Sequence, residues 1–276
     1  RLTNPLNPKI INQVLTLGKG AKIKAMTPAS DSAGLRARLD RGLAHHRAGR
    51  TLEAERLYRG ILADAPLHPD ALHYLGVVLH QRGDSAAAIG FLEKAAVPLG
   101  ANPDFHANFG LALKNAGRAA RAKDHFSRAL ALAPGHRGAL EALGLALGED
   151  GDWAAAAALF RRLAALDAGS ADPGLAAHGS AGAHYLLGSA LAELGQAEDA
   201  IAGLGEAIRL DPGFAEARFR LAAVLADGRR CDDAAAVLGP IFAANPKDLR
   251  ALTTMADIRA RAGDAAGREA WLARAR

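Results

Sequence analysis

The sequence predicts an all-α protein built from stacked antiparallel helix hairpins, and three observations support this fold class. First, the 276-residue chain is rich in Ala, Leu and Gly but only 5% aromatic, which favours closely packed helices over a β-sandwich. Second, glycines recur at intervals of 34 residues. Third, alanines and large apolar residues recur at the same interval. Such a period is typical of a solenoid, in which each unit contacts mainly its neighbours.

The period places several residue types in one register across seven units. The first glycine of a unit is Gly42, Gly76, Gly110, Gly144 and, after a longer step of 44, Gly188. Small residues continue the series at Ala222 and Ala256. Seven residues later most units carry a second glycine: Gly49, Gly83, Gly117, Gly151, Gly195 and Gly263. In the sixth unit this glycine comes one place early, with Gly228 before Arg229. An alanine follows twelve residues after the first glycine in six units, and a large apolar residue follows four places further on in all seven.

Elementary helix chemistry explains the pattern as helix, tight turn and second helix. In unit two, Pro69 and Asp70 suit the first turn of a helix, where a missing N–H costs nothing and the dipole favours a carboxylate. Gly83 ends this helix and Asp84 caps the next. A glycine in mid-helix costs about 1 kcal/mol relative to alanine. We therefore expect Gly76 to permit close approach of the second helix, whose alanine has the same role.

The pattern resembles the tetratricopeptide repeat, which has the same period and the order Leu-Gly, Ala, aromatic, Pro. Unit three carries it as Phe109-Gly110, Ala122, Phe126 and Pro134. The resemblance covers about residues 35–276 and implies a right-handed superhelical solenoid whose first helices line a concave wall. It also implies a non-catalytic protein–protein interaction scaffold.

We predict four segments along the chain. They are a basic leader at 1–34, units 1–4 at 35–168, an insertion loop at 169–180 and units 5–7 at 181–276. The leader carries +4 of the net charge of +5, so the repeats themselves are nearly neutral. It is expected to form an N-terminal capping helix. The alternatives are a disordered basic tail, or a segment that docks on a partner or an acidic lipid surface. The insertion is rich in Gly, Ala and Ser and is expected to be a long loop or a short extra helix.

The sequence holds no constellation of residues typical of catalysis, metal binding or cofactor binding. The segment 18–22 lacks the spacing of a phosphate-binding loop, and no HExxH motif occurs. His73 and His80 lie seven residues apart, which is far for two ligands of one ion on a helix. The lone Cys231 offers no disulfide, and no run of 18 apolar residues exists. We therefore expect a cytoplasmic protein that is not an enzyme and binds no cofactor, metal or nucleic acid.

The resemblance implies a peptide-binding groove along the first helices. Its polar side chains and scattered rings suit an extended peptide, and its change from basic to acidic along the chain predicts that acidic groups of the ligand face units 1–3. The predicted groove residues are Arg36, Asp40, Arg47, His73, Tyr74, His80, Asn108, Lys114, Asn115, Glu141, Tyr185, Phe219 and Arg220. Two binding modes known in the family are disfavoured, because only Asn108 matches the carboxylate clamp for chaperone C-termini or the asparagine ladder of O-linked N-acetylglucosamine transferases.

Four functions remain to be weighed. The leading one is a scaffold that binds a protein segment. The alternative is a substrate-recruiting or regulatory domain of a larger bacterial enzyme of glycosyltransferase, sulfotransferase or hydroxylase type, whose catalytic part is absent from this sequence. An RNA-binding helical repeat is disfavoured by the nearly neutral repeats. A complete enzyme comes last, because no acid, base and nucleophile converge in the pattern.

Overall fold

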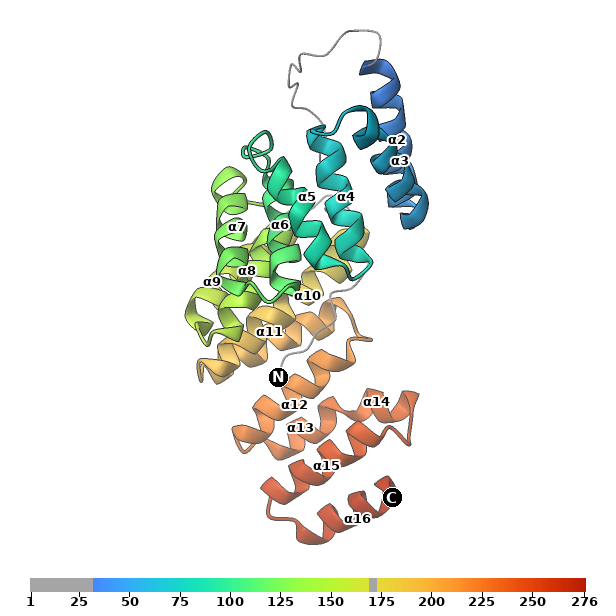
Figure 1. Cartoon of the computed structure of the whole chain (residues 1–276). Coiled ribbons are helices and arrows are strands. Elements are labelled where there is room, and N and C mark those ends of the chain that lie inside the picture. The colour runs from blue at the N-terminus through green and yellow to red at the C-terminus, as the bar shows by residue number, and fades with distance from the viewer. Residues whose placement is uncertain (1–31, 169–172) are drawn as a thin grey trace. The chain divides into compact units, whose positions relative to one another are not determined.

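The structure is a computed structural model that describes residues 32–168 and 173–276, and in these ranges all regular secondary structure is helical (Figure 1). The fold class predicted from the period is confirmed. The predicted capping helix of the leader lies outside the described residues.

The described helices form seven hairpins. We name the first helix of each hairpin the A helix and the second the B helix. The A helices are α2 (Ser32–Arg47), α4 (Pro69–Gln81), α6 (Pro103–Asn115), α8 (Arg137–Glu149), α10 (Pro173–Glu193), α12 (Ala215–Asp227) and α15 (Leu249–Arg261). The B helices are α3 (Thr51–Asp64), α5 (Ser85–Ala95), α7 (Ala119–Leu132), α9 (Trp153–Ala168), α11 (Ala197–Leu210), α13 (Cys231–Val237) with α14 (Gly239–Ala244), and α16 (Ala265–Ala275). Pro240 lies in the first turn of α14, where proline is tolerated, and accounts for the division of this B helix.

The chain divides into two compact parts, which we describe separately. From here on we call these parts unit 1 and unit 2, and we call the repeats hairpins. Unit 1 comprises Arg1–Ala142 and unit 2 comprises Leu143–Arg276. In each unit a B helix packs against the A helix of its own hairpin and against the A helix of the next hairpin. The apolar residues of the core therefore lie within and between neighbouring hairpins, as expected for a repeat protein.

In the first five hairpins the first glycine makes room for the large apolar residue sixteen positions later. A Cβ atom built on Gly42 would lie 2.5 Å from the Tyr58 ring, and one on Gly144 would lie 2.5 Å from the Phe160 ring. On Gly76 it would lie 2.7 Å from the Leu92 side chain and 3.2 Å from the Ala88 carbonyl oxygen. Close packing at the glycine is confirmed, but its main contact is the large side chain rather than the alanine.

In six of the hairpins the second glycine ends the A helix in the left-handed conformation. Gly83 has φ +91° and Gly195 has φ +73°. The following Asp84 accepts a hydrogen bond from the Ala87 N–H at 2.9 Å, as predicted for a cap. In the sixth hairpin, where the glycine is displaced by one position, Arg229 takes the left-handed place with φ 62°. A side chain in this conformation costs roughly 1–2 kcal/mol.

The insertion was expected to be a long loop or a short extra helix. Residues 169–172 lie outside the described residues, but α10 begins at Pro173 and is 21 residues long. Residues 173–180 are therefore helical rather than a loop, and they extend the A helix toward its N-terminus. Proline is well suited to the first turn of a helix, and the alanines that follow favour continuation.

Candidate binding surfaces

Charged side chains on the A helices of three hairpins in unit 1 influence the titration of Tyr74. Burial is the largest cause of the raised pKa of Tyr74. The carboxylates of Asp70 and Asp104 raise this pKa further, whereas Arg47 and Arg36 lower it. These residues come from α2, α4 and α6. The Tyr74 side chain is half-buried and stacks on the Tyr58 ring at a centroid distance of 5.9 Å. We call the surface around Tyr74, with Arg36, Asp40 and Arg47, the Tyr74 face.

The predicted groove residues on α2 lie at the molecular surface of this face. Arg36 and Asp40 are exposed and form an ion pair one turn apart at 3.2 Å. Arg47 is also exposed. Exposed ion pairs of this kind contribute little to stability, so a ligand can replace them at small cost.

Several other predicted groove residues instead connect neighbouring helices. The Asn108 Nδ2 atom lies 3.1 Å from His73 Nε2, and His80 Nδ1 lies 3.0 Å from Ser85 Oγ. Lys114 is half-buried and Asn115 is exposed near the end of α6. The pair His73–Asn108 connects α4 to α6, so it forms part of the junction between two hairpins.

His73 and Phe219 were predicted to line the groove, but the structure shows that both residues are buried. His73 is 2% exposed, and burial lowers its pKa to about 4. Its ring packs against Tyr74 and Phe105 at centroid distances of 4.9 and 5.3 Å. Phe219 is 7% exposed and is covered by the Arg250 guanidinium, which lies 3.9 Å from the ring centroid. Helix periodicity predicts that these residues lie on the inward-facing side of the A helices. It does not show that a neighbouring helix covers them.

The remaining predicted groove residues have separate surroundings. Glu141 is half-buried in unit 1, and its burial raises the pKa of the carboxyl while Arg137 lowers it. In unit 2, the Tyr185 ring packs on Phe214 at 5.1 Å. Arg220 donates to Glu193 Oε1 at 2.5 Å and to the Ser189 carbonyl at 3.3 Å. The Arg220 side chain therefore connects α12 to α10 across a hairpin junction.

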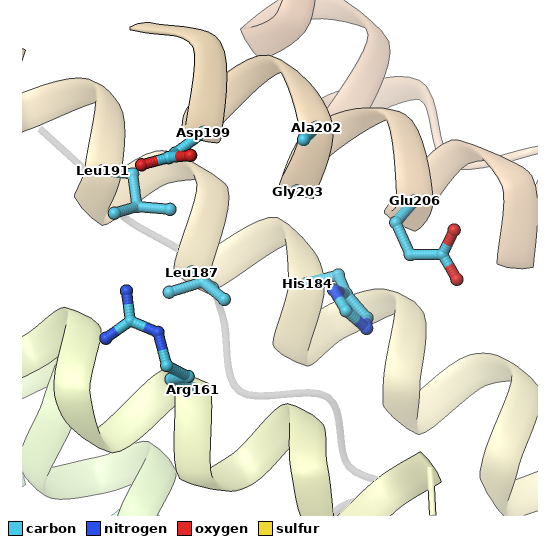
Figure 2. A pocket seen from close by; sticks show the side chains of 8 residues that line it. All are labelled: Arg161, His184, Leu187, Leu191, Asp199, Ala202, Gly203 and Glu206. Carbon is cyan, nitrogen blue, oxygen red and sulfur yellow. The ribbon is translucent and has the colours of Figure 1, made fainter. Parts of the chain in front are cut away.

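A second surface, which the sequence analysis missed, lies between two B helices of unit 2. A cavity of about 350 Å³ is open to solvent between α9 and α11, with α10 as its floor (Figure 2). Arg161 stands on the α9 wall, and Asp199 and Glu206 stand on the α11 wall. Leu187 and Leu191 contribute apolar surface from α10. We call this cavity the α9–α11 groove.

The family follows from the repeats and is supported by comparison with known proteins. Family models described as tetratricopeptide repeat match residues 39–104, 108–173 and 191–258. The chain belongs to the tetratricopeptide-repeat family. No curated protein matches the sequence.

Solved structures of other repeat proteins share the fold. A tetratricopeptide-repeat protein from Parabacteroides merdae matches at 15% identity and TM-score 0.61, covering 88% of this chain and 92% of that chain. YrrB, described as having an unusual peptide-binding site, matches at 22% identity and TM-score 0.53, covering 67% of this chain and 90% of its own. MamA matches at 21% identity and TM-score 0.54, covering 67% of this chain and 96% of its own. At these identities the likeness establishes the fold alone.

Two searches of the described residues bear on other kinds of site. None of their helices has the length and apolar character needed to cross a bilayer. The same residues contain no group of three or more His, Cys, Asp or Glu side chains placed to hold a metal ion.

Proposed function

We propose that this protein is a non-catalytic scaffold that binds an extended segment of a partner protein at the Tyr74 face. The observation that carries the proposal is the exposed Arg36–Asp40 pair and the exposed Arg47 on α2, together with the half-buried Tyr74 ring that stacks on Tyr58. Protein interaction is the general role of the family. A recruiting domain of a larger enzyme would use the same face in the same way.

The chemistry of the Tyr74 face suits a peptide with an apolar side chain near acidic groups. The tyrosine ring offers a flat apolar surface and a hydroxyl group, a combination that is common at interfaces. The exposed Arg36 and Arg47 attract carboxylates, and arginine can hold a carboxylate through two hydrogen bonds. An acidic segment that crosses from α2 toward α4 would meet these groups in turn.

The test is selection of binding peptides by phage display against the intact chain, followed by affinity measurements on variants. We expect Tyr74→Ala and Arg47→Glu to weaken the selected peptides tenfold or more. The matched control is Arg56→Glu, which makes the same charge change at an exposed position on α3. Circular dichroism would verify that each variant is folded. Equal affinities for Arg47→Glu and Arg56→Glu would refute the assignment of the Tyr74 face.

A further inference from the structure

Gly203 lines the α9–α11 groove at a place where the other hairpins carry a larger side chain on the B helix. Fifteen residues after the first glycine, or its alanine replacement, the fifth hairpin has Gly203. At the same place the other hairpins carry Leu57, Phe91, His125, Leu159, Val237 and Trp271. Each of these six side chains is buried or half-buried. In the fifth hairpin, therefore, the B helix contributes no side chain to the apolar layer at this place.

The missing side chain also brings α11 close to α10. A Cβ atom built on Gly203 would lie 3.2 Å from the Cα atom of Gly188, so the two helices approach backbone to backbone. Ala202, beside Gly203, is exposed at the rim of the groove. The floor then presents Leu191, which is buried, and Leu187, which is half-buried. Large apolar side chains bury best in concave surfaces of this kind.

Two oppositely charged side chains at the rim of the groove are separated from each other. The side chains at the equivalent positions of the second and third hairpins form an ion pair. In unit 1, Glu93 on α5 and Arg121 on α7 form an ion pair at 3.1 Å. The equivalent places in the fourth and fifth hairpins hold Arg161 and Asp199, with the charges reversed. These two side chains form no ion pair with each other or with any other described residue, and they face the groove from opposite walls (Figure 2).

The second carboxylate of the α11 wall is already neutralised. Glu206 accepts two hydrogen bonds from Arg209, at 2.7 and 2.6 Å. Asp199 is therefore the carboxylate that a ligand can recruit, and Arg161 is the matching cation. The groove thus has an apolar floor, one free positive group on the α9 wall and one free negative group on the α11 wall.

We propose that the α9–α11 groove is a second docking site, which takes an extended peptide with a large apolar side chain between an acidic and a basic residue. The apolar side chain lies in the groove over Leu187 and Leu191. The acidic residue pairs with Arg161 and the basic residue pairs with Asp199. In an extended peptide, residues i, i+2 and i+4 point to the same side, so charges two places before and after the apolar residue face the groove with it. This site is separate from the Tyr74 face and goes beyond the proposed function.

The experiment uses the intact chain and fluorescein-labelled nine-residue peptides that differ only at three places. The probes carry a central Leu flanked two residues away by Glu and Lys, by two Glu or by two Lys. A fourth probe carries Glu and Lys around a central Gly. We expect the Glu/Leu/Lys peptide to bind most tightly by fluorescence anisotropy and the central Gly to weaken it at least tenfold.

Two variants test the location of the site. Ala202→Phe fills the groove from its exposed rim and is expected to weaken the Glu/Leu/Lys peptide at least tenfold. Its control is Ala236→Phe, the same change at the equivalent exposed place on α13, which should leave the affinity unchanged. Arg161→Glu makes both walls acidic and should transfer the preference to the peptide with two Lys residues.

The proposal is overturned if no peptide binds, if Ala202→Phe and Ala236→Phe behave alike, or if Arg161→Glu leaves the charge preference unchanged. Binding that is lost with Tyr74→Ala but retained with Ala202→Phe belongs to the Tyr74 face and also overturns it. The two proposals therefore fail independently.

Discussion

The two units use the same hairpin but join their hairpins with different polar chemistry. In unit 1 histidines make several of the contacts, beside arginine ion pairs such as Arg121–Glu93: His46 Nε2 lies 2.8 Å from Gln81 Oε1, and His136 Nε2 lies 3.0 Å from Asp104 Oδ1. The buried His73 and the half-buried Asn108 join α4 to α6. In unit 2 arginines have this role.

The arginine contacts of unit 2 are more exposed than the histidine contacts of unit 1. Arg220 donates to Glu193, and Arg261 forms an ion pair with Asp227. The Arg261 and Asp227 side chains are 51% and 65% exposed, whereas the His73 residue is 2% exposed. A buried imidazole is sensitive to protonation, and an exposed ion pair is sensitive to salt. The comparison therefore predicts that the two units respond to different solution conditions.

The largest expected effect is destabilisation of unit 1 by acid. Burial lowers the pKa of His73 to about 4, with Asp104 raising it and His46 lowering it. Between the unfolded value near 6.5 and the folded value near 4, the unfolded state binds more protons, so stability falls as the pH falls. At 1.36 kcal/mol per pKa unit, the loss from this residue approaches about 3 kcal/mol near pH 4.

Hydrogen exchange followed by mass spectrometry at pH 7.5, 6 and 5 checks this prediction. After correction for the intrinsic exchange rate, amides of α4 and α6 should lose protection before those of α11 and α12. Simultaneous loss in the two units would contradict the comparison.

The variant His73→Phe should show how much of the acid sensitivity of unit 1 comes from His73, because it removes the titrating imidazole. The new ring can still pack against Tyr74 and Phe105, but Asn108 loses its partner, at a cost of about 1 kcal/mol at pH 7.5. Because the variant has no imidazole at this place, its stability should fall less steeply between pH 6.5 and 4. Denaturant titrations at several pH values measure both effects, and an unchanged pH slope would assign the acid sensitivity to other groups.

A smaller effect concerns the turn of the sixth hairpin in unit 2. Arg229→Gly removes a Cβ atom from the left-handed region and should stabilise this hairpin by about 1 kcal/mol. The exposed hydrogen bond from Arg229 to the Arg261 carbonyl is lost, which reduces the gain slightly. Gly263→Ala is the opposite change at φ +79° and should destabilise by a similar amount. Thermal unfolding compares the two variants, and a lower melting temperature for Arg229→Gly would refute the strain argument.

The smallest expected effect is that of salt on unit 2. Raising NaCl from 0.05 to 1 M shortens the screening length from above 10 Å to about 3 Å. The exposed pairs Arg220–Glu193 and Arg261–Asp227 should lose a few tenths of a kcal/mol each. Exchange of the α12 and α15 amides should therefore increase relative to that of the α4 amides. A larger increase in α4 would reverse the comparison.

The fold could be predicted from the sequence because its determinants repeat. The small residue of one hairpin and the large apolar residue sixteen positions later occur in the same register in all seven repeats, and each pair lies within one hairpin. The displaced Gly228 likewise distinguishes the sixth turn from the others by its position in the chain. The helical part of the insertion was harder to predict, because the same small residues are common in loops and in helix extensions.

The candidate sites were less predictable because they depend on contacts between hairpins. Periodicity places His73 on the A-helix side, but its burial depends on Tyr74 and on Phe105 of the next hairpin. The sequence does carry one sign of the α9–α11 groove. Gly203 is the only small residue at its position among the seven hairpins. An alignment of the units can show this difference, but the separation of Arg161 and Asp199 depends on how α9 and α11 are placed in space.

Gly203 also bears on how recognition can change over evolutionary time. Because each hairpin packs mainly on its neighbours, removal of one side chain alters a single junction and leaves the packing of distant hairpins intact. A change of one codon can therefore alter the packing and the surface of one junction in such a protein. Duplication of a 34-residue unit followed by such a change would give a copy with a different partner and the same backbone.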